Sequence, residues 1–428
     1  MTKFVALLLA LTLCIGLCAC GAQPEAPAAT DAPAAEAPAE ETPAATSETE
    51  ATTGSKDIKV GFIFLHDENS TYDLNFINAA KAACAEVGLS DDQVMMKTNI
   101  SESQACYDAA AELVDAGCDL IITDSFGHES FALAAAKEFP EVHFVSCTGV
   151  KAHTEGLSNF HNAFASIYEG RYLAGVAAGM KLNEMIEAGE FTADQAKMGY
   201  VGAFTYAEVI SGYTSFYLGA KSVCPTVTMD VTFTGSWYDE ALEKEAANKL
   251  IAGGCKLISQ HADSMGAPTA CELAGVPNVS YNGSTESACP NTFIVSSRID
   301  WTPYFELIIQ AATGGTAIDP DWTGTLKTGS VVLTDLNEKV AAKGTAEKIA
   351  EATKQLEDGT LHVFDTSTFT VEGKTLTSYM ADVNTDANNE GDTEAVADGY
   401  FHESEYRSAP YFNVQIDGIK LLDKNFGN

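Results

Sequence analysis

The chain has few basic residues. Lys and Arg number 24 among 428 residues, against 60 Asp and Glu, so the formal net charge is −36. Basic side chains this sparse cannot form a patch over most of the chain, and nucleic acid and anionic lipid head groups are therefore poor partners for the folded body. Hydrophobic residues make up 46% of the sequence, as in soluble globular proteins, and the length is enough for two domains.

The sequence also lacks the motifs of common catalytic and metal sites. It contains no Cys-x-x-Cys pair, no Gly-x-Ser-x-Gly elbow, no P-loop and no Gly-x-Gly-x-x-Gly. His128 and His402 are each followed by Glu, but neither has the second His of a zinc-protease helix four positions later. The alternating acids and amides of 382–388 lack the central Gly of a calcium loop, which favours a solvated acidic turn. We therefore predict a binding protein rather than an enzyme, with no metal and no cofactor.

The first 20 residues have the pattern of a secretory signal. A run of 17 uncharged, mostly apolar residues follows Lys3 and is too short and too weakly flanked for a convincing membrane span. It ends in Leu-Cys-Ala-Cys, followed by Gly21, which resembles the bacterial lipobox and makes Cys20 the predicted lipidated residue. We expect a protein held by this lipid on the extracytoplasmic face of the bacterial cell membrane. The alternative is an ordinary signal peptide cleaved without lipidation.

Residues 21–55 form a linker of Pro, Ala, Glu and Thr. The segment has five Pro, seven acids and no basic or aromatic residue, so it cannot bury a core and is expected to be a solvated tether. The remaining residues 56–428 carry 23 basic and 53 acidic side chains, a net charge of −30. The acidity therefore belongs to the folded body.

Eight cysteines lie in that body. Their even number would allow disulfides outside the cell, but several sit among Ala, Gly and apolar residues at apparent core positions. A body of this size does not need disulfides for stability. We favour buried free thiols.

Short apolar runs alternate with helical patterns along the body. Residues 59–66, 118–124 and 142–147 are typical of buried strands, each bounded by Gly, Pro or Asp. Helical periodicity occupies 103–116 and 129–138 between them. This order predicts an α/β fold with a parallel sheet covered by helices.

The same pattern then starts again. Residues 197–205 repeat 59–67 at an offset of 138, and 250–264 repeat 113–127 at an offset of 137. Two matching offsets indicate two similar α/β lobes. Ligands of open α/β sheets bind beyond the carboxyl ends of the strands, so we expect a cleft where the loops of the two lobes face each other.

The loops after these strands contain aromatic rings beside carboxylates and amides. Flat rings can enclose a planar heterocycle while Asp and Asn bind its edge, which describes recognition without a reaction. Any single aromatic residue could instead belong to a lobe core or to the surface. The residues concerned are Asp67, Asn69, Tyr72, Asp73, Asn75, Phe126, Ser236–Asp239, His261, Asp263, Tyr281 and Asn282.

Eight segments, in this order along the chain, carry a family resemblance: KVGFIFLHD from 59, TDSFGHES from 123, KEFPEVHFVSCTGVK from 137, IYEGRYLAGVAAG from 167, AEVISGY from 207, TGSWYDEALEKEAA from 234, LISQHADS from 257 and DGTLHVFD from 358. Together they resemble the basic membrane protein family, whose members are substrate-binding lipoproteins of ABC importers. The resemblance runs over nearly all of 57–428. It implies a type I periplasmic-binding-protein fold, in which two parallel-sheet α/β lobes joined by three crossovers close over a small ligand, largely a purine nucleoside or nucleobase.

The resemblance also implies a division of the chain. We expect a signal peptide at 1–20, a linker at 21–55, a first lobe of 56–160 plus 299–325, and a second lobe of 161–298 plus 326–428 that includes a C-terminal tail. The implied partners are a purine-like ligand, the permease and ATPase subunits, and the membrane through the lipid. The protein is expected to be a monomer.

The family's stacking aromatics correspond to Tyr72 and Trp237. When this chain is aligned with the family by counting back from Gly88, Tyr72 falls at the position of the first stacking aromatic. An alignment without an insertion in the preceding loop would put Ser70 at that position instead. The resemblance makes Asp67 the loop Asp that supports this segment and Asp73 a polar ligand contact, with Phe126 as a wall of the cleft.

Two positions depart from the family's nucleoside binders. Asn282 stands where those members have an Asp that holds the ribose hydroxyls, and Ile299 stands near their ribose-contacting Lys. Asp263 resembles the branch in which a free base is the more natural ligand. We therefore expect Asp73, Asp263 and Asn282 to read the edge of a purine nucleobase or nucleoside. The alternatives are a sugar or signalling molecule as ligand, or a receptor that reports to a membrane sensor.

Overall fold

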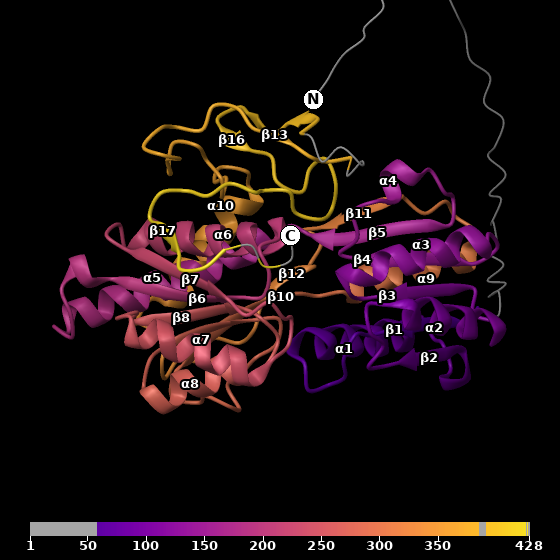
Figure 1. Cartoon of the computed structure of the whole chain (residues 1–428), viewed down its shortest axis with the longest axis horizontal. Coiled ribbons are helices and arrows are strands. Elements are labelled where there is room, and N and C mark those ends of the chain that lie inside the picture. Colours follow the sequence, from indigo (N-terminus) through magenta and orange to yellow (C-terminus); the bar gives the residue numbers. More distant parts are fainter. Residues whose placement is uncertain (1–57, 385–390, 425, 427–428) are drawn as a thin grey trace, which may run out of the picture. The chain divides into compact units, whose positions relative to one another are not determined.

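Two sheets of mainly parallel strands organise residues 58–384, 391–424 and 426, which are the residues that this computed structural model describes (Figure 1). The predicted signal peptide, the linker and Cys20 lie outside these residues. No helix among the described residues is both long enough and apolar enough to span a membrane.

The first sheet has six strands in the order β11-β5-β4-β3-β1-β2, all parallel. Alternate residues of β1 point to opposite faces: Val60 and Phe62 pack with α1 and α9, whereas Ile63 packs with α2 and α3. Both faces are therefore covered, as the apolar strands require. The bounds are β1 (Val60–Ile63), α1 (Thr71–Glu86), β2 (Val94–Lys97), α2 (Gln104–Asp115), β3 (Leu120–Thr123), α3 (Glu129–Glu138), β4 (His143–Cys147), α4 (Ala152–Glu155), β5 (Phe160–Ala165), α9 (Thr302–Gly314) and β11 (Asp321–Gly324).

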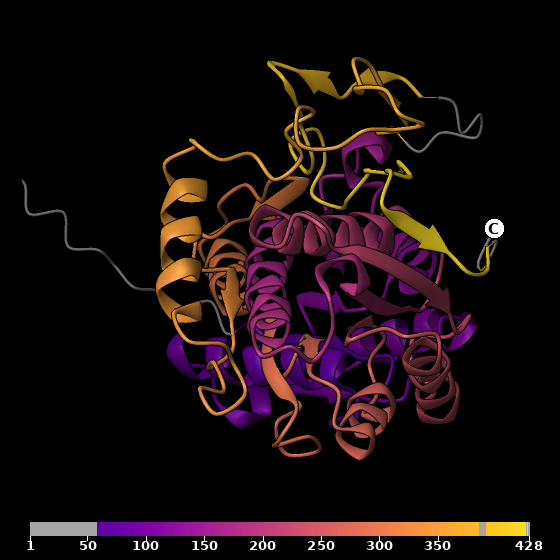
Figure 2. The ribbon, with the colours of Figure 1, turned by 90° about the vertical axis from the view of Figure 1, so that its left-hand side faces the viewer.

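The second sheet has seven strands in the order β12-β10-β9-β8-β6-β7-β17. Its edge strand β12 runs antiparallel to β10, while the other pairs are parallel. Helices α5 and α6 cover one face and α7 and α8 the other (Figure 1), and α10 packs against α5 (Figure 2). The bounds are α5 (Ile167–Glu187), β6 (Lys197–Gly202), α6 (Ala207–Val223), β7 (Thr228–Phe233), α7 (Glu240–Ala252), β8 (Leu257–His261), α8 (Gly266–Ala274), β9 (Asn278–Tyr281), β10 (Phe293–Ile299), β12 (Val331–Leu333), α10 (Thr345–Glu357) and β17 (Ile419–Leu421).

The two sheets repeat one strand order. The series β5-β4-β3-β1-β2 in the first corresponds to β10-β9-β8-β6-β7 in the second. The segments that repeat in the sequence form β1 and β6, and β3 and β8, which hold equivalent places. The prediction of two α/β lobes with parallel sheets is confirmed.

The chain passes between the sheets three times. It crosses after β5, after β10 and after β11. The expected start of the second lobe at residue 161 is wrong, because residues 160–165 pair with β4 and β11 in the first sheet. All six residues of β5 are buried, so its sequence gives no local sign of the lobe to which it belongs.

Helices α5 and α6 touch through glycines. A Cβ added at Gly175 would overlap the carbonyl oxygen of Phe216, and one added at Gly219 would overlap that of Tyr172. The two backbones therefore approach as closely as the absence of side chains allows.

The eight cysteines of the body are all buried and none forms a disulfide. This confirms the prediction of free thiols. Burial raises the pKa of several of them, that of Cys84 to about 11 and that of Cys255 to about 12. They are core residues rather than reactive ones.

The C-terminal segment after α10 contacts both lobes. Its last strand, β17, extends the second sheet beside β7. The main-chain N–H of Ser408 donates to both carboxylate oxygens of Asp321 in β11 of the first sheet, at 3.1 Å each. The short strands of this segment are β13 (Met380–Ala381), β14 (Thr393–Glu394), β15 (Val396–Ala397) and β16 (Tyr400–Phe401).

Candidate functional site

A pocket lies where the carboxyl ends of the strands of the two lobes meet. Its free space, counted out into the open solvent, is about 350 Å³. The first lobe supplies loops that follow β1, β3 and β4, and the second supplies the start of α6 and the ends of β7, β8 and β9. Its lining residues are Leu65, Tyr72, Ser125, Phe126, Thr148, Glu208, Trp237, His261, Asp263 and Tyr281.

Six of the residues singled out from the sequence line this pocket: Tyr72, Phe126, Trp237, His261, Asp263 and Tyr281. Tyr72 comes from the first turn of α1, and Trp237 from the loop after β7 in the other lobe. The indole packs edge-on against Phe204, with ring centroids 5.0 Å apart. Neighbouring rings thus fix its orientation, and the pocket receives an aromatic ring from each lobe.

Phe126 lies at the junction of the two lobes. Its ring is 37% exposed, and its centroid is 5.4 Å from that of Tyr206 in the second lobe. Nearby, the rings of His66 and Tyr238 also face each other across the lobes, at 5.5 Å. The main-chain N–H of Thr71 donates to the carbonyl of Asp263 at 3.0 Å. These contacts show the two lobes in a closed arrangement.

Asp263 is buried in the second-lobe wall. Its carboxylate accepts from the side-chain amide of Asn282 at 3.3 Å. Burial raises the pKa of Asp263 well above its ordinary value, and the carboxyls of Asp73, Glu243 and Glu208 add to the effect. A carboxyl that keeps its proton can donate a hydrogen bond as well as accept one.

Asn282 is placed behind this carboxyl and does not line the pocket. Its backbone has a φ of 67°, a left-handed conformation that Asn adopts more readily than most residues. The structure therefore shows Asn282 supporting Asp263.

Neither Asp73 nor Asp67 lines the pocket. Asp73 is fully buried at the start of α1, where it accepts hydrogen bonds from the N–H of His66 at 2.7 Å and the hydroxyl of Ser70 at 2.6 Å. Burial alone would raise the pKa of Asp73, but hydrogen bonds from His66, Asp124 and Ser70 outweigh it and lower that pKa. Ser70 is the N-cap of α1, so Tyr72 and not Ser70 faces the pocket.

Asp67 stabilises the loop before α1. It accepts from the N–H of Asn69 at 3.1 Å and from the side-chain amides of Asn69 and Asn99 at 2.8 and 3.3 Å. These hydrogen bonds lower the pKa of Asp67. They connect the loop after β1 to the loop after β2.

Beside His261, the pocket is lined by Glu208, a residue that the sequence analysis did not single out. Glu208, in the first turn of α6, lies 3.3 Å from Nε2 of buried His261. Behind them, the guanidinium of Arg171 stacks 4.3 Å from the Tyr281 ring centroid and donates to the carbonyl of Gln260 at 2.9 Å. Burial lowers the pKa of Arg171 to about 10, and its Nε and Nη1 atoms have no hydrogen-bond partner within the part of the chain that the structure describes. Glu208 and Arg171 both lie in segments that carry the family resemblance.

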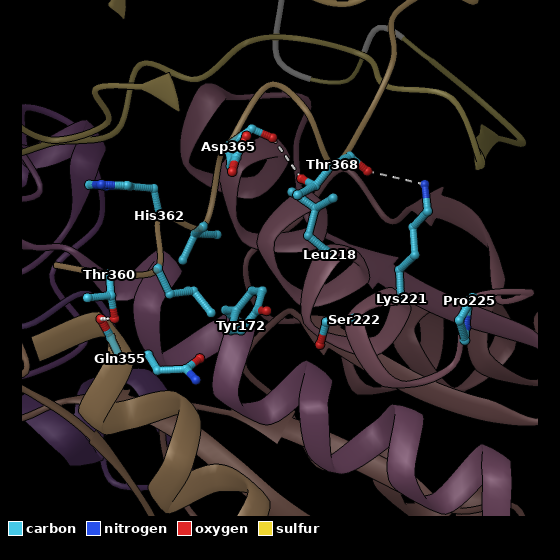
Figure 3. Close-up of a pocket in the computed structure, with 12 residues that line it drawn as sticks. Tyr172, Leu218, Lys221, Ser222, Pro225, Gln355, Thr360, His362, Asp365 and Thr368 are labelled. Carbon is cyan, nitrogen blue, oxygen red and sulfur yellow. Dashed lines mark hydrogen bonds between the residues drawn. The ribbon is translucent and has the colours of Figure 1, made fainter. Parts of the chain in front are cut away.

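A larger cavity of about 1150 Å³, counted out to solvent, lies elsewhere, between α5, α6 and residues 355–368 (Figure 3). One phenol ring, that of Tyr172, lines it, and Lys221 donates to the carbonyl of Thr368 along its rim at 3.5 Å. All its lining residues belong to the second lobe and the C-terminal segment. A ligand there would make no contact that depends on lobe closure, so this cavity lacks the coupling that a closing receptor requires.

Known proteins match much of this chain. Residues 64–361 match the family Bmp, described as ABC transporter substrate-binding protein PnrA-like. A purine-binding protein of Brucella abortus is 30% identical over 322 residues, covering 73% of this chain and 85% of that protein. A candidate ABC transporter glucose-binding protein of Haloferax volcanii is 29% identical over 270 residues, covering 63% of this chain and 64% of that protein, just under two thirds of its length. An ABC transporter solute-binding protein of Aeropyrum pernix K1 shares the fold, with a TM-score of 0.60 and 19% identity over 72% of this chain and 93% of that one.

Proposed function

Because the chain belongs to the Bmp family of ABC transporter substrate-binding proteins, we propose that it captures a purine nucleobase or nucleoside between its two lobes. The family is one of binding proteins, and the chain is not an enzyme. The proposed complex passes its ligand to the permease and ATPase subunits of an importer. We further propose that a monomer acts at the extracytoplasmic membrane face, anchored through Cys20.

The observation that carries the ligand proposal is the pair of rings from opposite lobes, Tyr72 and Trp237, in one pocket. A flat heterocycle between them contacts both rings only when the lobes are closed. Each aromatic pair adds about 0.5–1.5 kcal/mol beyond the burial of its area. The ligand therefore stabilises the closed state through contacts that the open state lacks.

Two departures from the nucleoside-binding pattern favour a free base. The Asn282 amide is engaged by Asp263, and Ile299 is a buried core residue whose carbonyl accepts from Asn75 at 2.6 Å. Neither side chain offers the charged group that would hold ribose hydroxyls. We propose that a nucleobase binds at least as tightly as its nucleoside.

A sugar is the second candidate ligand, because one relative is described as a glucose-binding protein. A thermal-shift panel of adenine, hypoxanthine, adenosine, inosine and glucose separates the candidates, since a ligand of the folded state raises its stability by mass action. We expect bases to give the largest shifts and calorimetry to rank adenine at or above adenosine. A shift with glucose alone would overturn the purine proposal, and a clear preference for adenosine would overturn the proposal of a free base.

A further inference from the structure

Thr148 is a pocket residue in an unusual conformation. It follows β4, lines the pocket from the first lobe and is 3% exposed. Its φ of 66° is in the left-handed region, which β-branched residues rarely adopt. Its hydroxyl oxygen is buried and has no hydrogen-bond partner among residues 58–384, 391–424 and 426. A buried hydroxyl without a partner is costly, so a ligand group that satisfies it contributes to binding.

Glu208 approaches the same pocket from the second lobe. Its side chain is 14% exposed, and its hydrogen bond among the described residues joins Oε1 to His261. The other carboxylate oxygen remains available to accept. The buried guanidinium of Arg171 lies behind the pocket wall. Its positive charge offsets the negative charge of Glu208.

These two side chains present acceptor oxygens from opposite lobes. A ring N–H has one hydrogen and satisfies one acceptor, whereas an amino group has two and can satisfy both. The Glu208 carboxylate in the pocket wall also disfavours a ligand that carries negative charge.

We propose that Thr148 and Glu208 determine the specificity of the pocket by binding the exocyclic amino group of a neutral aminopurine. This inference rests on the proposed function and names the class of purine that the site selects. The amino group bridges the lobes, so its two hydrogen bonds form together only in the closed state.

The test measures, by calorimetry, the affinities of the mature protein for adenine and for unsubstituted purine, which lacks the amino group. We expect Glu208→Gln to weaken adenine binding about tenfold or more, since a hydrogen bond to a charged group is lost. The same variant changes the affinity for unsubstituted purine less than about threefold. Purine binding thus reports an intact pocket in each variant.

A matched pair of substitutions tests Thr148. Thr148→Val keeps the branched side chain and its backbone strain but removes the hydroxyl, and we expect adenine to bind about fivefold more weakly. Thr148→Ser keeps the hydroxyl and is expected to bind adenine as the wild type does. The control is Glu240→Gln, an exposed Glu in the first turn of α7, which should leave both affinities unchanged.

Each outcome decides between the two proposals. Equal losses for adenine and unsubstituted purine, or no loss with either, would overturn the assignment of the amino group while leaving purine binding in place. A wild-type protein that binds no purine at all would overturn the proposed function and this inference with it.

Discussion

The phenol hydroxyl of Tyr72 donates a hydrogen bond of 2.5 Å to the main-chain carbonyl of Asp124. The two residues follow the neighbouring strands β1 and β3, so the bond joins two loops at the edge of the pocket. The ring also packs against Phe76, with centroids 4.9 Å apart. Tyr72 is thereby held in one orientation before a ligand binds, which reduces the entropy lost on binding.

This arrangement predicts a graded effect of two substitutions. Tyr72→Phe keeps the ring and loses the bond, and we expect purine affinity to fall about threefold. Tyr72→Ala also removes the stacking face, and we expect a loss of about tenfold or more. Calorimetry with adenine measures both. Wild-type affinity in Tyr72→Ala would remove this residue from the site.

Trp237 is the corresponding ring of the second lobe. We expect Trp237→Ala to weaken purine binding about tenfold or more, because a desolvated stacking face is lost, and Trp237→Phe to retain part of the affinity. Tyr406→Ala is the control, since it removes an exposed ring of the C-terminal segment that does not line the pocket. If Trp237→Ala bound adenine as tightly as this control, the indole would have no part in recognition.

The contact between α5 and α6 predicts a stability effect. A methyl group at Gly175 meets the backbone of Phe216, which cannot move as a flexible side chain could. We expect Gly175→Ala to lower the free energy of unfolding by about 1–3 kcal/mol, as overpacked cores do. Gly314→Ala is the control: its Cβ meets only the Thr316 hydroxyl at 3.5 Å, and its stability should be close to that of the wild type. Urea denaturation compares the two.

The Glu403 carboxyl predicts a dependence of stability on pH. Burial raises its pKa from 4.5 to about 8. Between these values the folded state keeps a proton that the unfolded state releases. The stabilisation is therefore complete below 4.5 and is lost as the pH rises through about 8.

Glu403→Gln imitates the protonated side chain. Relative to the wild type, we expect its free energy of unfolding to increase with pH across this window, by at most about 1.4 kcal/mol per pH unit. Denaturation at several pH values measures the difference. Glu286→Gln, an exposed control, should follow the wild type at every pH. A parallel course of the Glu403→Gln and wild-type curves would show that Glu403 does not bind the extra proton.

The sequence predicted those parts of the fold that local patterns determine. Helix α3 spans the predicted residues 129–138 because its apolar spacing and the flanking strands set both ends. The end of the first lobe was misplaced because β5 is buried throughout and pairs with strands distant in sequence. Which sheet a buried strand joins depends on tertiary contacts that its own residues do not reveal.

The residues of the candidate site could likewise be predicted only in part from the sequence. Trp237 stands in a polar loop where a large ring has few structural uses, and it lines the pocket as predicted from the sequence. Asp73 stands in the first turn of α1, where Ser70 and His66 bind its carboxylate, and no sequence pattern distinguishes such a helix-start residue from a ligand contact. Thr148 was missed because its backbone conformation and its unpartnered hydroxyl can be seen only in three dimensions.

The bond between Ser408 and Asp321 limits how the two lobes can part. Only four residues after Ser408, Phe412 is buried in the second-lobe core, with its ring 4.3 Å from that of Phe364. Four residues reach no more than about 14 Å when fully extended. The C-terminal segment therefore acts as a short tether at one border of the two lobes. A rotation that opens the lobes must hinge near this border and separate them on the opposite side.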